Sequence, residues 1–96
     1  MPTPEGSELT FIVHGPVVRA DLPGLYQRVR CLLEGTDARV AFCEVQRVKA
    51  DAVTVDALAR LQLAGRRHGC QVRLRGGSAQ LRELVGFMGL ADMLPD

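Results

Sequence analysis

Strand-type and helix-type segments alternate along the whole chain, and this alternation restricts its fold more than any other feature. Three short runs rich in β-branched and apolar residues predict strands at 10–13, 40–45 and 71–75. Each run is followed by a segment whose apolar residues recur at three- and four-residue spacing, which predicts a helix. This order favours right-handed crossovers and at least some parallel strand pairing. The sequence therefore predicts an α/β domain.

Short polar residues stand where each predicted helix begins, and a glycine stands where each one ends. The predicted N-caps are Asp21, then Asp51 or Thr54, then Ser78, and the predicted stops are Gly35, Gly69 and Gly89. The apolar stripe of the last helix is Leu81, Leu84, Val85 and Met88. All three phenylalanines, Phe11, Phe42 and Phe87, lie in apolar runs and are predicted to be core residues.

Length and charge exclude several classes of protein. Ninety-six residues make one domain with one core, which we place at 9–96 after a flexible lead-in at 1–8. Twelve Lys and Arg against eleven Asp and Glu give a net charge of +1, which excludes a protein that binds nucleic acid mainly by neutralising phosphates. No apolar stretch reaches the roughly 18–20 residues that cross a bilayer, so no direct membrane insertion is expected.

The cysteines indicate a reducing, cytoplasmic location. Cys31, Cys43 and Cys70 are odd in number, widely spaced and outside any CxxC pair, so a disulfide framework is not expected. Cys43 with His14 or His68 is the best thiol–imidazole pair in the chain. Because Cys43 falls inside a predicted buried strand, its thiol is expected to pack as a small hydrophobic group. We therefore expect no catalytic residues, no metal site and no cofactor.

The segment from Lys49 to Asp56 joins the second strand to the longest helix. Loops at the carboxyl ends of strands are the usual functional edge of an open α/β sheet. Asp51 or Thr54 caps the helix here, and Asp56 complements the positive end of its dipole. These roles leave the segment free to bind a partner.

Read with the residues around it, this segment resembles a STAS domain, the family of sulphate transporters and anti-sigma factor antagonists. In that family a hydrophobic strand is followed by Asp-Ser-x-Gly-Leu at a helix start, a Leu-rich helix, a short strand, and a last helix that closes in Gly-Leu. The corresponding segments here are Cys43-Glu44-Val45, Asp51-Ala52-Val53-Thr54-Val55, Leu58 to Gly69, Val72 to Arg75, and Ser78 to Leu94. The resemblance covers about residues 9–94. It implies a small mixed β-sheet with helices packed mainly on one face.

Two departures from the family pattern bear on regulation. The serine that an anti-sigma kinase phosphorylates in the antagonists is Ala52 here, which has no hydroxyl, and the following glycine is Thr54. A phosphoserine switch at this helix start is therefore absent from its usual place. Thr54 is the candidate substitute phospho-acceptor, although a threonine at a helix start is more often a cap.

The resemblance implies a non-enzymatic regulatory protein that binds its partner through Asp51, Ala52, Val53, Thr54 and Asp56. The implied partner is a regulatory protein such as an anti-sigma factor with a kinase-like fold, and a homodimer stays open. One alternative is an accessory cytosolic subunit that docks on the ATPase of a bacterial lipid-transport complex. Another is a domain that binds a nucleotide or other anion through Arg73, Arg75 and the helix start at Ser78.

Overall fold

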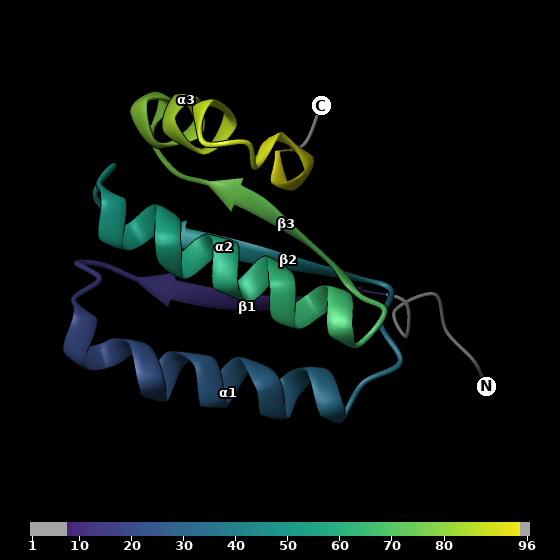
Figure 1. Cartoon of the computed structure of the whole chain (residues 1–96). Helices are drawn as coiled ribbons and strands as arrows, with labels where there is room; N and C mark the ends of the chain where they lie inside the picture. The colour runs from purple at the N-terminus through teal and green to yellow at the C-terminus, as the bar shows by residue number, and fades with distance from the viewer. Residues whose placement is uncertain (1–7, 95–96) are drawn as a thin grey trace.

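A three-stranded parallel sheet forms the centre of the fold (Figure 1). The computed structural model describes residues 8–94. The sheet has the order β1-β2-β3, and both of its pairings are parallel. The elements in chain order are β1 (Glu8–His14), α1 (Leu22–Glu34), β2 (Val40–Gln46), α2 (Ala52–Arg67), β3 (Gln71–Gly76) and α3 (Ala79–Phe87). Short 3-10 helices at Arg19–Asp21 and Ala91–Met93 precede α1 and follow α3. The predicted α/β class is confirmed, and the mixed sheet that the resemblance implied is parallel in its three described strands.

The predicted lead-in lies almost wholly outside the described residues. Only Glu8 of the segment 1–8 is described, and it is the first residue of β1. Among the described helices, none is both long and apolar enough to cross a membrane.

The helices α1 and α2 cover one face of the sheet, and α3 lies beyond β3 at its edge (Figure 1). Alternate strand residues point toward α1 and α2 and are buried, because successive side chains of a strand face opposite sides. Phe11, Cys43 and Leu74 form one row of this buried face. The two helices contribute mainly aliphatic residues to the same core, namely Leu22, Leu25, Val29, Leu33, Val55, Ala57, Leu58 and Leu61. The prediction that helices pack mainly on one face is therefore confirmed.

The opposite face of the sheet is partly polar and more exposed. Ile12 is 42% exposed on it, and the guanidinium of Arg75 lies 4.0 Å from the centre of the Phe42 ring. Phe42 is thus half-buried beneath a cation rather than enclosed in the core, where the sequence placed it.

Two of the predicted helix ends are confirmed in detail. The Ser78 side chain accepts a hydrogen bond from the backbone N–H of Leu81 at 3.1 Å. Gly89 has a φ of +83°, and the N–H of Leu90 donates to the carbonyl of Val85 at 3.0 Å. This is the Schellman ending that a glycine at this position favours.

The predicted cap at the start of α1 is wrong, whereas α1 does end at Gly35 as predicted. Asp21 lies in helical geometry at the end of the 3-10 turn, and its side chain forms no capping hydrogen bond. The preceding turn already brings the chain into helical geometry, so no extended N-cap residue is needed. Gly35 closes α1 with a φ of −97°, which does not require glycine.

The prediction that Phe87 and Met88 are buried is also wrong. Phe87 is 87% exposed and Met88 is 58% exposed. The reason is the place of α3 at the sheet edge, where only a narrow stripe of the helix contacts the core. Leu81 and Val85, four residues apart, form this stripe, and Phe87 falls outside it.

Gly65 sets the distance between α2 and β3. A Cβ at this position would lie 2.6 Å from Cγ2 of Val72 and 2.7 Å from the carbonyl oxygen of Cys70. We expect Gly65→Ala to destabilise the protein, although the same change inside an open helix usually stabilises by about 0.5–1 kcal/mol.

Gly24 in α1 is the matched control, because a Cβ there would meet nothing within 4 Å. Gly24→Ala should raise the free energy of unfolding in a urea titration, and Gly65→Ala should lower it. Equal effects of the two variants would contradict a close approach at Gly65.

Candidate functional site

The start of α2 is held in place by a side-chain cap. Asp51 has extended backbone geometry, and its carboxylate accepts a hydrogen bond from the backbone N–H of Thr54 at 2.9 Å. This hydrogen bond holds the pKa of Asp51 below its ordinary value of 3.8. Of the two predicted caps, Asp51 is therefore the one that forms. It fixes α2 at the edge where the parallel strands end.

Thr54 lies inside the core. It is 1% exposed. Its hydroxyl forms no hydrogen bond of good geometry with the described residues, but it lies close enough to the Asp51 carboxylate to help lower the pKa of that group. A kinase would therefore reach this hydroxyl only after the first turn of α2 opened. Val53 beside it is half-buried. The structure thus removes Thr54 from the surface of the predicted site.

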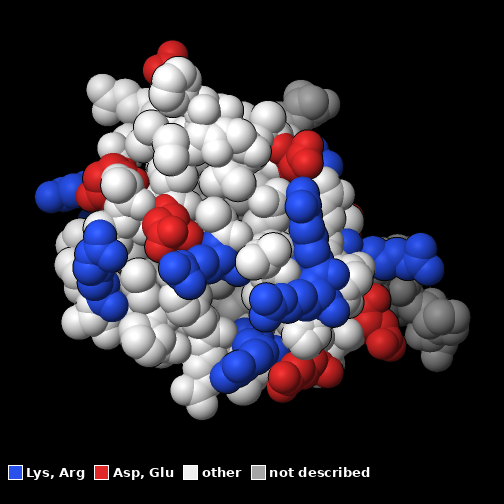
Figure 2. Space-filling model, viewed as in Figure 1, with Lys and Arg blue, Asp and Glu red and all other residues white. Residues whose placement is uncertain are grey.

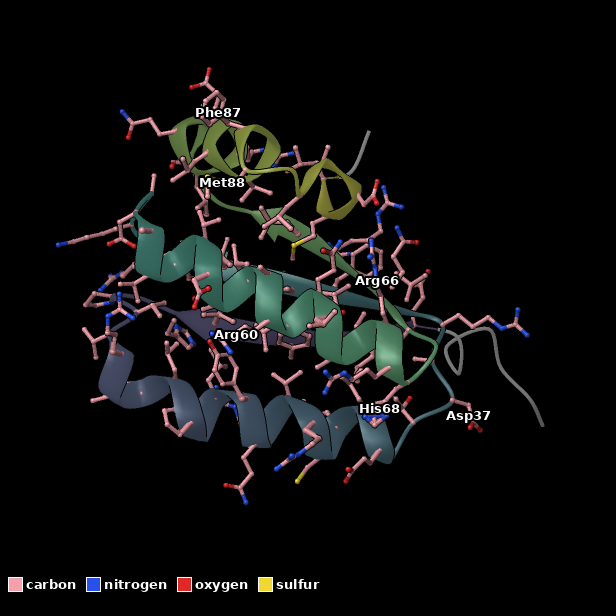
Figure 3. The ribbon with its side chains drawn as sticks, in the orientation of Figure 1. Asp37, Arg60, Arg66, His68, Phe87 and Met88 are labelled. Carbon is pink, nitrogen blue, oxygen red and sulfur yellow. The ribbon has the colours of Figure 1, made fainter. Side chains whose placement is uncertain are left out.

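Ala52 and Asp56 remain on the surface, and they border a groove. The groove has a volume of about 520 Å³ and runs between the start of α2 and the end of α3. Its apolar lining is Ala52, Val55, Ala59, Met88 and Leu90. Figure 3 shows Met88 on the side of α3 that faces α2, and Phe87 on the side that faces away. We call the surface made by Ala52, Asp56 and this groove the partner face.

Charged side chains stand around the groove. Arg19, from the 3-10 turn before α1, lines it together with Asp56 and Arg60 of α2. The Nε of Arg60 lies 3.1 Å from an Asp56 carboxylate oxygen, and the two residues form an exposed ion pair one helical turn apart. Arg19 forms no ion pair within residues 8–94. The groove therefore has an apolar floor and a rim with one unpaired cation.

Arg19, Met88 and Leu90 were not predicted as part of the site. They are far from residue 52 in the sequence, and only the packing of α3 and the 3-10 turn brings them beside α2. The available signal was the short length of the last helix, which cannot bury every apolar residue near its end.

The residues of the alternative anion site already have other contacts. A guanidinium nitrogen of Arg73 donates to the carbonyl of Leu94 at 3.1 Å, and Arg75 lies over Phe42. The oxygen of Ser78 accepts the capping hydrogen bond from the N–H of Leu81. These contacts hold the three side chains against the fold, and each side chain keeps N–H or O–H donors that its contact does not use.

Cys43 is fully buried beneath the helices, and burial raises the pKa of its thiol to about 12. His14 and His68 are exposed. The thiol therefore stays protonated at neutral pH, as a packed hydrophobic group does. No group of three or more metal-ligating side chains occurs among the described residues.

Comparisons of the chain with protein-family models, with curated proteins and with solved structures found no match.

The buried hydroxyl of Thr54 leads to a stability prediction. A buried hydroxyl without a well-formed hydrogen bond costs about 1–3 kcal/mol of desolvation, and its proximity to the Asp51 carboxylate offsets part of that cost. Thr54→Val should therefore raise the free energy of unfolding, by no more than about 1 kcal/mol. Thr36→Val is the control, because the Thr36 hydroxyl accepts a hydrogen bond from the N–H of Ala38 at 3.1 Å, and its loss should destabilise. Denaturant titration of both variants measures the difference. A loss of stability in Thr54→Val would show that this hydroxyl is bonded in solution.

The Asp51 cap leads to a pH prediction. Because the folded pKa lies below the unfolded value, the cap stabilises fully above the unfolded pKa, and this contribution is lost as the pH falls through the folded pKa. Asp51→Ala should therefore lower Tm at pH 7, and its gap to wild type should narrow below about pH 4. Asp51→Asn, which still caps but does not titrate, is the control. A gap that stays constant between pH 7 and about pH 2.5 would contradict a charged cap.

Proposed function

We propose that this chain is a non-enzymatic protein-interaction module that binds a regulatory protein through its partner face. The observation that carries the proposal is the exposed apolar groove beside Ala52. The Asp51 cap holds the start of α2, and with it this side of the groove, in place. Apolar floors with polar rims are typical of protein interfaces. Because Ala52 and Ala59 have small side chains, a partner's backbone can approach α2 closely.

The resemblance to STAS domains supports a particular kind of partner. In the antagonist branch, the same helix start contacts an anti-sigma factor with a kinase-like fold, and phosphorylation there ends the contact. Here Ala52 offers no hydroxyl, and the hydroxyl of Thr54 is buried. We therefore infer a partner of that type and a contact that phosphorylation at this helix start does not switch off. The free thiols of Cys31, Cys43 and Cys70 support a reducing, cytoplasmic location for both proteins.

Ala52→Glu tests the proposal. A glutamate in the first turn of a helix interacts favourably with the helix dipole, so the variant should fold. It would also bring a charge and a longer side chain to the floor of the groove. We expect wild type to capture a kinase-fold regulator from the lysate of its native host, and Ala52→Glu to bind that regulator at least about tenfold more weakly, roughly 1.4 kcal/mol.

The control is Gln27→Glu, which adds the same charge at an exposed position of α1. It should leave the affinity unchanged. If Ala52→Glu binds the same regulator as well as wild type does, the partner face plays no part in the contact. Capture of a membrane transporter's ATPase would favour the lipid-transport alternative, and a thermal shift with ATP or GTP would favour the nucleotide alternative.

A further inference from the structure

The end of α3 carries the most exposed large hydrophobic side chain in the described part of the chain. Phe87 is 87% exposed, and Met88 beside it is 58% exposed. Figure 2 shows a broad uncharged area over α3, with charged side chains around it. An exposed aromatic ring in such an area is the kind of anchor that protein interfaces bury at their centre.

Phe87 forms a ridge with a charged residue of the same helix. Glu83 lies one turn before Phe87 in α3, and both border one shallow depression on its outer side. Glu83 takes part in no ion pair within residues 8–94. The outer side of α3 therefore offers an apolar ring and an unpaired carboxylate one turn apart.

The groove of the partner face offers the complementary features. Its floor is apolar, its volume of about 520 Å³ is ample for an aromatic ring, and Arg19 on its rim is an unpaired cation. The ridge and the groove adjoin at consecutive residues, Phe87 and Met88, which lie on different sides of α3 (Figure 3).

We propose that the chain forms a two-fold dimer in which Phe87 of each copy occupies the groove of the other. In this dimer Glu83 lies opposite Arg19 of the partner subunit. In the proposed dimer the two-fold axis passes near residues 87–88, so that both contacts form together and the assembly closes. An interface centred on one aromatic ring per subunit is small, so the dissociation constant is on the order of micromolar.

The dimer has a consequence that rests on the proposed function. Ala52 and Asp56 border the same groove, so a groove filled by Phe87 cannot bind the regulatory protein. Dimerisation and partner binding then exclude each other. At high protein concentration the dimer covers the partner face.

Sedimentation velocity on the purified chain from about 1 to 200 µM tests the dimer directly. We expect a concentration-dependent shift toward twice the 10.4 kDa mass of the chain. Phe87→Ser should remain monomeric throughout. Leu63→Ser is the control, because Leu63 is also an exposed apolar residue, at 52%, but lies outside the groove. It should dimerise like wild type.

A charge exchange tests the orientation. Glu83→Arg and Arg19→Glu should each weaken the dimer about fivefold or more, and the double variant should regain most of the wild-type affinity. All these side chains are exposed, so circular dichroism should show an unchanged fold.

The proposed dimer is contradicted if wild type stays monomeric, or if Phe87→Ser dimerises as well as wild type does. It is also contradicted if the double variant does not regain the dimer affinity, or if wild type forms species larger than a dimer. These measurements need no partner, so they fail or succeed independently of the proposed function. If the dimer and the proposed function are both correct, Phe87→Ser should bind the regulatory protein more tightly than wild type does when the protein concentration is high enough for wild type to dimerise.

Discussion

The close packing of α1 and α2 on one face of the parallel sheet is the constraint on which the rest of the structure depends. The central strand β2 contributes two small residues to this face, Ala41 and Cys43, both fully buried. Gly65 lets α2 approach β3 closely. Short side chains at these positions let the helices lie directly on the sheet, and the aliphatic residues of α1 and α2 fill the remaining space.

This packing also decides where a functional surface can form. In a parallel sheet all strands end at one edge, so α2 begins beside the carboxyl ends of β1 and β2. The Asp51 cap then fixes the first turn, with Ala52 outward and Thr54 inward. A short third helix beyond β3 supplies the other wall of the groove. The partner face is therefore a product of three separate segments that the sheet holds together.

The elements themselves were predictable, because hydrophobic period and capping chemistry act within a few residues. The strands and helices fall where the sequence placed them to within a few residues, and Ser78, Asp51, Gly69 and Gly89 mark ends as expected. Apart from the Asp21 cap, which does not form, the failures concern side chains whose burial depends on distant neighbours. Phe87 reads as a core residue from its apolar run, yet α3 lies at an edge where nothing among the described residues covers it. Thr54 was predicted as a partner-binding residue and candidate phospho-acceptor, yet α2 turns its side chain inward.

The sequence by itself determined the order of strands and helices, most of the helix ends, and the absence of a hydroxyl at position 52. Each of these follows from local chemistry: the spacing of apolar residues, the hydrogen-bonding capacity of a cap, and the identity of one side chain. Only the tertiary structure decided which apolar residues are exposed, that Thr54 is enclosed, and that Arg19 and Met88 stand beside Ala52. These depend on how whole elements pack across the sheet, and no pattern within one segment carries that information.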